Sequence, residues 1–116
     1  MIKIIAPSIP PSNNEFMGNS HSHRIYASKK QEWHWLIKAA IRKKPDKPFN
    51  RAAVEITYFF PDRRRRDPDN YSGKFILDAL VKEGVLIDDS FFVVRLILNA
   101  AVDKENPRTE IEIKEC

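Results

Sequence analysis

The chain has 116 residues, of which 42% are hydrophobic, and this length suits one compact domain over residues 1–116 with a single modest core. A formal net charge of +4 and a sequence pI near 9.3 fit a polyanionic partner without proving one. One cysteine excludes an internal disulfide framework and indicates a reducing compartment. No apolar run has membrane-spanning length and no signal-peptide pattern is present, so we expect a soluble, cytoplasmic protein.

The first half of the chain predicts a strand, a loop, a helix and a second strand. Residues 2–6 form a short apolar run, which a loop rich in Pro, Ser and Asn follows. A capping-box spacing and helical periodicity predict a helix from about Ser28 to Lys44. Residues 53–60 alternate apolar side chains and predict a strand. The two tryptophans, at positions 33 and 35, fall on different helix faces, so we expect one in the core and the other at a dimer interface.

The second half predicts a helix and two more strands. Pro68 disfavours helical geometry before it, so we expect the helix to begin at Asp69 or Asn70 and to end at Gly84. Two strands and a hairpin loop between them follow, over residues 93–102, 109–115 and 103–108. The order β-α-β-α-β-β predicts a small α/β domain of the α+β type, with a mixed sheet of about four strands and two main helices.

Four consecutive arginines stand directly before two aspartates, Asp67 and Asp69, spaced i and i+2. Guanidinium groups bind phosphates through forked hydrogen bonds, and paired carboxylates supply the oxygen ligands that Mg²⁺ prefers. Four like charges repel one another and gain most if phosphates lie close by, so we expect the run to contact the DNA backbone. Side chains alternate along extended backbone, so about two of the four face the site. The arginines are Arg63, Arg64, Arg65 and Arg66. The alternative is a solvated turn in which Asp69 caps a helix.

A second acidic pair, Asp88 and Asp89, follows the second predicted helix. A helix of roughly 14 residues is about 20 Å long. Asp89 therefore joins Asp67 and Asp69 only if the segment over residues 85–92 folds back along the helix. If it does, three carboxylates form a magnesium site beside the arginines, suited to activating water and hydrolysing a phosphodiester.

These motifs, in this order, resemble the RusA family of Holliday junction resolvases. The resemblance rests on residues 61–70 (PDRRRRDPDN), residues 77–80 (LDAL), the pair at 88–89 and the early loop at 10–14 (PPSNN), and it spans almost the whole chain. It implies a RusA-like fold and a homodimeric endonuclease that depends on Mg²⁺, with Mn²⁺ as a substitute ion. Such an enzyme binds four-way junction DNA and nicks two strands symmetrically in recombination and repair. Similar chains come from bacteria and their phages or prophages.

The resemblance also implies roles for individual residues. Asp67, Asp69 and Asp89 are the expected catalytic metal ligands, and Asp88 is the reserve ligand. Lys74 is the candidate catalytic lysine, expected to contact the scissile phosphate or to stabilise developing charge. One extra residue between Asn70 and Asp78, relative to a well-known pattern of the family, leaves the register of Lys74 open.

Four further polar residues are expected around this site. Asn70 and Asp78 are expected to support the site residues without binding the metal themselves. Asp78 stands four residues after Lys74, so the structural interpretation is an ion pair across one helical turn. The functional interpretation is that Asp78 holds Lys74 toward the metal site. Asn13 and Asn14 either shape the N-terminal loop through local hydrogen bonds or touch DNA.

Two other functions stay open at this point. One is a noncatalytic nucleic-acid binding module that keeps the basic loop and assembles no metal site. The other is a metal-dependent nuclease that acts on flaps or simple duplexes. The residues do not choose the cleavage sequence or the number of metal ions.

Overall fold

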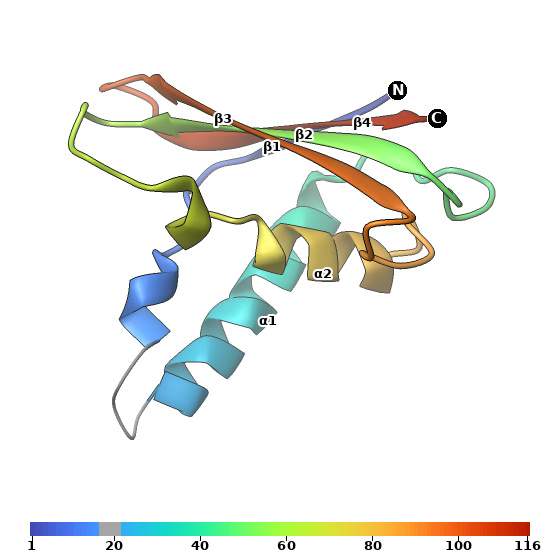
Figure 1. Ribbon diagram of the computed structural model, residues 1–116, viewed down its shortest axis with the longest axis horizontal. Helices are drawn as coiled ribbons and strands as arrows, with labels where there is room; N and C mark the ends of the chain where they lie inside the picture. The colour runs from blue at the N-terminus through green and yellow to red at the C-terminus, as the bar shows by residue number, and fades with distance from the viewer. Residues whose placement is uncertain (17–21) are drawn as a thin grey trace.

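The computed structural model describes residues 1–16 and 22–116 and has the predicted architecture, a mixed four-stranded sheet with two helices on one face (Figure 1). The strands are β1 (Ile2–Ala6), β2 (Ala52–Phe60), β3 (Val94–Val102) and β4 (Arg108–Glu115). The helices are α1 (Ser22–Ala40) and α2 (Lys74–Lys82), with two 3₁₀ turns, η1 (Asn13–Phe16) and η2 (Pro68–Asn70). The predicted order β-α-β-α-β-β is confirmed.

Within the described ranges, no helix has both the length and the apolar character that crossing a membrane requires.

The strands follow the order β1-β4-β2-β3 across the sheet. β2 pairs antiparallel with β4 and parallel with β3, and α2 makes the crossover between the two parallel strands. The predicted hairpin of the last two strands is therefore wrong, because β2 lies between them. Every second residue of β2, from Ala52 to Phe60, is buried, which suits a central strand. The segment after β3 passes over the end of β2, where the Asp103 amide donates to the Phe60 carbonyl at 2.8 Å.

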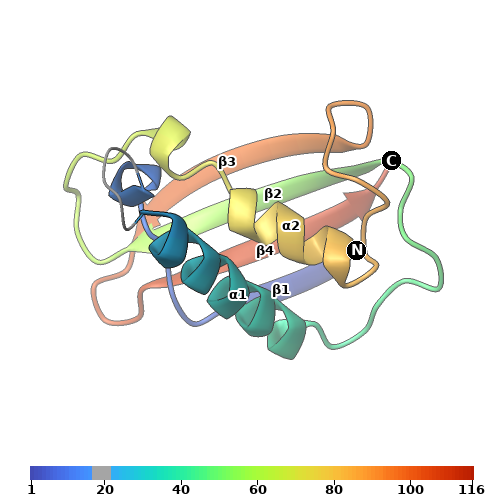
Figure 2. The ribbon, with the colours of Figure 1, turned by 90° about the horizontal axis from the view of Figure 1, so that it is seen from below.

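The core lies between the sheet and the two helices. Figure 2 shows α1 and α2 beneath β1, β4 and β2, with β3 at the margin. Each fully buried large apolar side chain contributes about 1.5–3 kcal/mol to folding. From the sheet and the helices, the most buried side chains include Ile4, Val54, Ile56, Ile111, Ile113, Trp33, Ile37, Ile76 and Leu80.

The first helix runs from Ser22 to Ala40 rather than from Ser28 to Lys44. It begins earlier because Tyr26 extends the buried stripe toward the N-terminus, with its ring centroid 5.2 Å from that of Phe75 in α2. The capping-box signal at Ser28 therefore lies inside the helix. At the other end Lys44 has left the helix and reaches the Glu83 carboxylate at 3.0 Å. The two tryptophans separate as predicted, since Trp33 is 2% exposed and Trp35 is 57% exposed.

The second helix begins at Lys74, later than predicted. The residues expected to begin it form the separate turn η2, and Gly73 divides the turn from the helix with a left-handed φ of 79°. Only glycine adopts this conformation without steric cost. The predicted end of the helix is confirmed, because Gly84 follows it with φ 75°.

Replacing Gly73 by alanine is expected to destabilise the fold by about 2–4 kcal/mol. A Cβ would lie 2.6 Å from Cδ1 of Ile56, which is fully buried and has little room to move. Gly84→Ala is the matched control, because its φ is similar and no atom lies within 4 Å of the added Cβ, so about 1–2 kcal/mol is expected there. Urea unfolding of both variants measures the difference, and equal losses would contradict the steric argument.

A buried carboxylate joins α2 to α1. Glu83 is 8% exposed and contacts Nε2 of His34 at 2.6 Å and Nζ of Lys44 at 3.0 Å. The hydrogen bond with His34 is the main cause that lowers the pKa of Glu83, and Lys44 adds to it. The contact holds the C-terminal end of α2 in place, which fixes where the following acidic segment begins.

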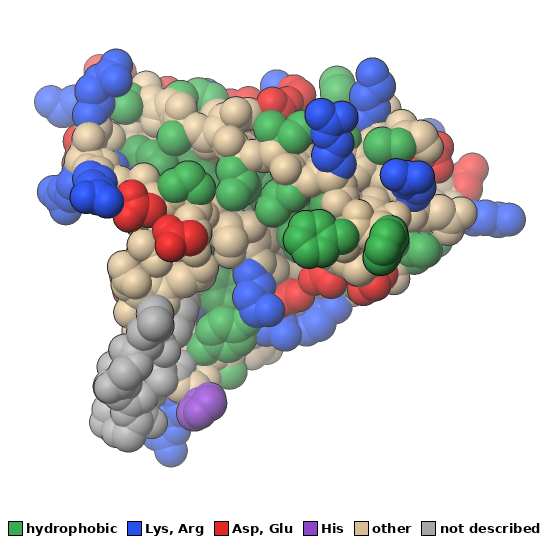
Figure 3. All heavy atoms as spheres, viewed as in Figure 1, with side chains coloured by type: hydrophobic (Ala, Val, Ile, Leu, Met, Phe, Trp, Pro, Cys, Tyr) green, Lys and Arg blue, Asp and Glu red, His purple; other side chains and the backbone are tan. Residues whose placement is uncertain are grey.

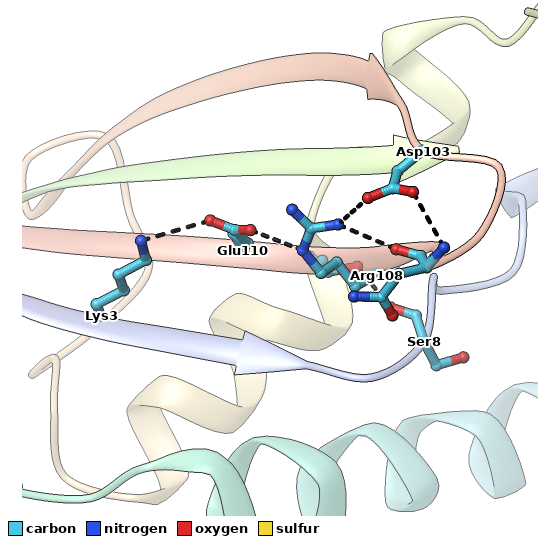
Figure 4. Close-up of polar contacts among 7 residues, drawn as sticks. Lys3, Ser8, Asp103, Arg108 and Glu110 are labelled. Atoms are coloured by element: carbon cyan, nitrogen blue, oxygen red, sulfur yellow. Dashed lines mark hydrogen bonds and ion pairs between the residues drawn. The ribbon is translucent and has the colours of Figure 1, made fainter. Parts of the chain in front are cut away.

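The sheet face away from the helices carries a row of charged side chains near one end (Figure 4). The Arg108 guanidinium lies 3.8 Å from the Phe59 ring centroid, at 2.8 Å from Asp103 and at 2.7 Å from Glu110. The Arg108 side chain is also the main cause that lowers the pKa of Asp103. Lys3 of β1 continues the row at 3.5 Å from Glu110. This network orders the loop between β3 and β4 at the end of the sheet that carries the arginine run.

Candidate active site

The two neighbouring aspartates lie on a turn that follows β2. Asp67 has extended backbone (φ −99°, ψ 142°), and η2 begins directly after it. The amide of Asn70 donates to the Asp67 carbonyl at 3.0 Å, which closes the turn. Asp67 is half-buried and Asp69 is exposed. Both carboxylates therefore sit on one tight turn that water, metal and DNA can reach.

The N-terminal loop holds this turn from the other side. Nδ2 of Asn13 donates to the backbone carbonyl of Asp69 at 2.9 Å and to Oγ of Ser72 at 3.3 Å. The predicted structural role of Asn13 is thus found, although its partner is distant in sequence rather than local. The amide of Asn14 donates to Oγ of Ser12 at 3.3 Å, which is a local loop contact. DNA contact by either asparagine stays a prediction.

An aromatic hollow lies beside Asp67, and sequence analysis missed it. Its walls include Tyr58, Phe60 and Tyr71, together with β3 residues such as Leu98. The ring centroids of Phe60 and Tyr71 are 5.2 Å apart in an edge-on arrangement. Burial raises the pKa of Tyr58 far above its ordinary value. The sequence signal that could have indicated this hollow is the alternation of inward-facing side chains along β2, the strand that leads into the arginines.

The four arginines have different environments. Arg66 is 16% exposed, and its guanidinium lies 4.3 Å from the Phe60 ring centroid while Nη1 donates to Oδ1 of Asp62 at 2.9 Å. The same nitrogen donates to the Asp62 and Arg64 carbonyls at 3.1 and 3.2 Å. Nε of Arg65 donates to Oδ1 of Asp67 at 3.2 Å, and the Arg65 side chain is 88% exposed. Arg66 thus shapes the loop, and its exposed neighbours, Arg63, Arg64 and Arg65, are available to phosphates.

Asp62 fixes the start of this loop. The backbone amide of Arg64 donates to Oδ1 of Asp62 at 3.0 Å, and this bond is the main cause that lowers the pKa of Asp62, with Arg66 second. The exposed carboxylate therefore stays ionised and keeps the Arg66 guanidinium folded back over Phe60.

Replacing Arg66 by lysine is expected to weaken four-way junction binding about tenfold, although the charge is kept. Lysine cannot reproduce the planar stack on Phe60 or the three hydrogen bonds that order the loop. Arg63→Lys is the control, because Arg63 is exposed. The junction affinity of this variant is expected to stay within about twofold of the wild-type value. Fluorescence anisotropy at fixed salt compares them, and equal affinities would show that loop order does not matter.

The second helix brings Lys74 and Asp78 into different surroundings. Lys74 is the first residue of α2 and is exposed. Asp78 is half-buried, with Oδ2 3.7 Å from Nζ of Lys30 in α1. The predicted pair between Lys74 and Asp78 is therefore replaced by one between helices, because α1 packs on the side of α2 that carries Asp78. Lys-to-Asp order along a helix also gives a weak pair.

The second acidic pair lies at the other end of α2. Asp67 lines a hollow with Leu98 and Ala100, in the middle and later part of β3, whereas Asp89 lines a different groove with Val94 and Leu96 at its start. The nine-residue α2 separates the two acidic segments by about 13 Å of helix. Among residues 1–16 and 22–116, no three His, Cys, Asp or Glu side chains form a group that could hold a metal. One chain therefore brings Asp67 and Asp69 together, and the segment that carries Asp88 and Asp89 does not fold back to them.

The donors that do meet fit a hard divalent cation. Mg²⁺ is commonly bound through one or two carboxylates, with water and substrate phosphates filling the other positions. Asp67 and Asp69 offer carboxylates on an exposed turn, and the neighbouring arginines suit the phosphates. Carboxylates placed among arginines at the end of a strand are an arrangement suited to metal-dependent cleavage of phosphodiesters.

Comparison with known proteins gives the family. The family profile described as Endodeoxyribonuclease RusA matches residues 7–114 of the chain. The chain therefore belongs to the RusA endodeoxyribonuclease family, and it is an endonuclease of the Holliday junction resolvase type, a metal-dependent class that binds junction DNA. A search of curated proteins found no match.

Proposed function

We propose that this protein resolves Holliday junctions by paired, symmetric nicks that depend on Mg²⁺, with Mn²⁺ as a substitute ion. The observation that carries the proposal is the acidic turn of Asp67 and Asp69, which Asn13 holds directly beside the arginine loop. Metal ligands and phosphate-binding groups thus meet at one place, as in-line hydrolysis of a phosphodiester requires. A cytoplasmic location is part of this proposal, because that is where junction DNA lies in bacteria and in phage-carrying cells, the sources that the resemblance implies.

Each group has a defined part in the proposed reaction. Asp67 and Asp69 hold the metal, which when bound supplies Lewis-acid polarisation of the phosphate and lowers the pKa of a bound water. Exposed Arg64 and Arg65 orient the DNA backbone, and Arg66 keeps their loop in shape. Lys74, at the start of α2, balances charge that develops on the scissile phosphate. Asn70 supports the turn through its backbone amide.

A matched pair of DNA substrates tests this function. The purified protein is incubated with a mobile synthetic four-way junction and with linear duplex of the same sequence, in Mg²⁺ or in chelator. Symmetric nicks confined to the junction, lost in chelator, are the expected result. Cleavage of the linear duplex at a similar rate would show a nuclease of different selectivity, and binding without cleavage under any metal would overturn the proposal.

A further inference from the structure

The face of α1 that points away from the core has no acidic residue along its middle. Six side chains recur along this face at alternating spacings of four and three, which keeps them on one side of the helix. All six are exposed, and Trp33 and Ile37 lie buried on the opposite side. The last of the six follows the final turn, which the Ile41 amide extends by donating to the Ile37 carbonyl at 3.0 Å. We call these residues the α1 track: Arg24, Ser28, Gln31, Trp35, Lys38 and Arg42.

The cations on the α1 track differ from the other cations of the helix in having no acidic partner. Away from the track, Lys29 lies 3.1 Å from the Glu32 carboxylate and Lys30 lies 3.7 Å from the Asp78 carboxylate. Within the described ranges, none of the three track cations forms an ion pair. Exposed like charges without partners gain most from a polyanion that runs alongside them.

An exposed tryptophan stands among these cations. Trp35 is 57% exposed, and Nζ of Lys38 lies 5.2 Å from its ring centroid. Tryptophan is highly buried on average, so a ring left open on a helix face calls for a ligand that covers it. The ring offers an apolar face for deoxyribose carbons, and its Nε1–H is a donor for a phosphate oxygen. A ring and a cation side by side therefore suit a sugar–phosphate backbone.

The α1 track begins near the acidic turn and leads away from it. The turn η1 contacts both α1 and η2, so the start of the helix lies close to the turn of Asp67 and Asp69. Figure 2 shows α1 crossing beneath the sheet from this end toward the opposite one. The 19 residues of α1 span about 28 Å, which equals about eight base pairs of duplex. The track thus has the length to follow a duplex that leaves the site.

The far end of the α1 track continues into a basic groove. Arg42 and Lys43 line this groove together with Lys3 and Phe49. Residues 38–51 contain six Lys or Arg and one acidic residue, Asp46. Figure 3 shows Lys and Arg side chains at the end of the molecule that carries the arginine loop and again at the opposite end. Positive charge is therefore available beyond the helix as well as along it.

We propose that the α1 track binds the sugar–phosphate backbone of a duplex arm of the junction, within about one helical turn of the cleaved bond. Arg24, Lys38 and Arg42 contact phosphates, and Trp35 packs against deoxyribose. Backbone contacts carry no sequence information, so the track directs the arm and does not choose the cleavage sequence. The inference rests on the proposed function for the identity of the DNA, because a four-way junction supplies an arm that leaves the site.

Neutral phosphates placed in the DNA test this contact directly. Methylphosphonates replace the phosphates of one junction over base pairs about 4–12 of each arm, counted from the branch point, and those of a second junction beyond about base pair 16. The longest dimension of the chain is 39 Å, equal to about 11 base pairs, so the second patch lies beyond the reach of the track. Affinity is measured by fluorescence anisotropy in chelator, which separates binding from cleavage.

Two charge-matched variants complete the comparison. Lys38→Gln/Arg42→Gln is the track variant, and Lys82→Gln/Lys114→Gln removes the same charge from exposed positions off the track. We expect the track variant to bind the unmodified junction about tenfold more weakly, with a salt slope less steep by about 1.8. The near patch should weaken wild-type binding about tenfold and binding by the track variant no more than about threefold, and the far patch should change neither. Equal losses in both variants, or equal sensitivity of wild type and track variant to the near patch, would overturn the proposal.

Tryptophan fluorescence gives a second readout, which a change of net charge does not mimic. Junction DNA that packs on Trp35 should quench the emission of the wild-type protein. Trp35→Phe retains Trp33, which is 2% exposed, and its emission should be nearly insensitive to DNA. Equal quenching in the two proteins would remove Trp35 from the DNA contact and assign the exposed ring to a protein partner instead.

The arm contact and the proposed function fail in different ways. A wild-type protein that shows the expected sensitivity to the near patch and cleaves nothing in Mg²⁺ would overturn the proposed function and leave the arm contact standing. A protein that nicks junctions in pairs, and whose track variant responds to the near patch as the wild type does, would overturn the arm contact alone.

Discussion

Asp69→Asn is expected to reduce junction cleavage by about 10³-fold or more while leaving the fold intact. The substitution keeps the shape of the side chain and removes the negative charge that a metal ligand requires. The contact that Asn13 makes is with the backbone carbonyl of Asp69, so the side-chain change leaves it in place. Stability is therefore expected to change by no more than about 0.5 kcal/mol.

Binding and cleavage should separate in this variant. Removing a carboxylate from beside the DNA phosphates is expected to leave junction affinity equal or higher, measured in Ca²⁺ or chelator. Asp46→Asn is the control, since Asp46 is an exposed carboxylate on the loop before β2. Single-turnover rates for both variants decide the matter. An Asp69→Asn protein that keeps a tenth of the wild-type rate would remove Asp69 from the metal site.

Short-range features were predictable from the sequence because they depend on neighbouring residues. Asp67 and Asp69 come together as expected, because they are two positions apart and Pro68 between them restricts the backbone of their turn. Gly84 ends α2 as expected, because a left-handed residue after a helix has a local chemical signature. The alternating apolar residues of β2 gave both its position and its buried face.

The errors concern features that distant packing decides. The last two strands follow one another in the chain, and no local signal shows that β2 is inserted between them. The first helix begins before its capping box because Tyr26 packs against Phe75, a residue of the other helix. The position of Asp89 relative to Asp67 likewise depends on how β3 crosses the sheet, which spacing alone does not give.

Lys74→Ala is expected to lower the cleavage rate about 10²-fold and, at the same time, to raise the stability of the fold slightly. Lys74 is the first residue of α2, where the positive end of the helix dipole disfavours a cation by about 0.3–1 kcal/mol. Alanine should therefore stabilise the protein slightly. A lysine that costs stability at this position is best explained by a role at the adjacent acidic turn.

Lys82→Ala is the matched control, because it removes the same charge from the last turn of the same helix. There the dipole favours a cation, so alanine should destabilise slightly and leave cleavage within about twofold. Single-turnover cleavage rates and thermal unfolding are measured for both variants. Lys74→Ala should lose activity and gain stability, whereas Lys82→Ala should keep its activity and lose stability. Equal cleavage rates would show that Lys74 has no part in the reaction, whereas a loss confined to Lys74→Ala, in the more stable of the two proteins, cannot be attributed to unfolding.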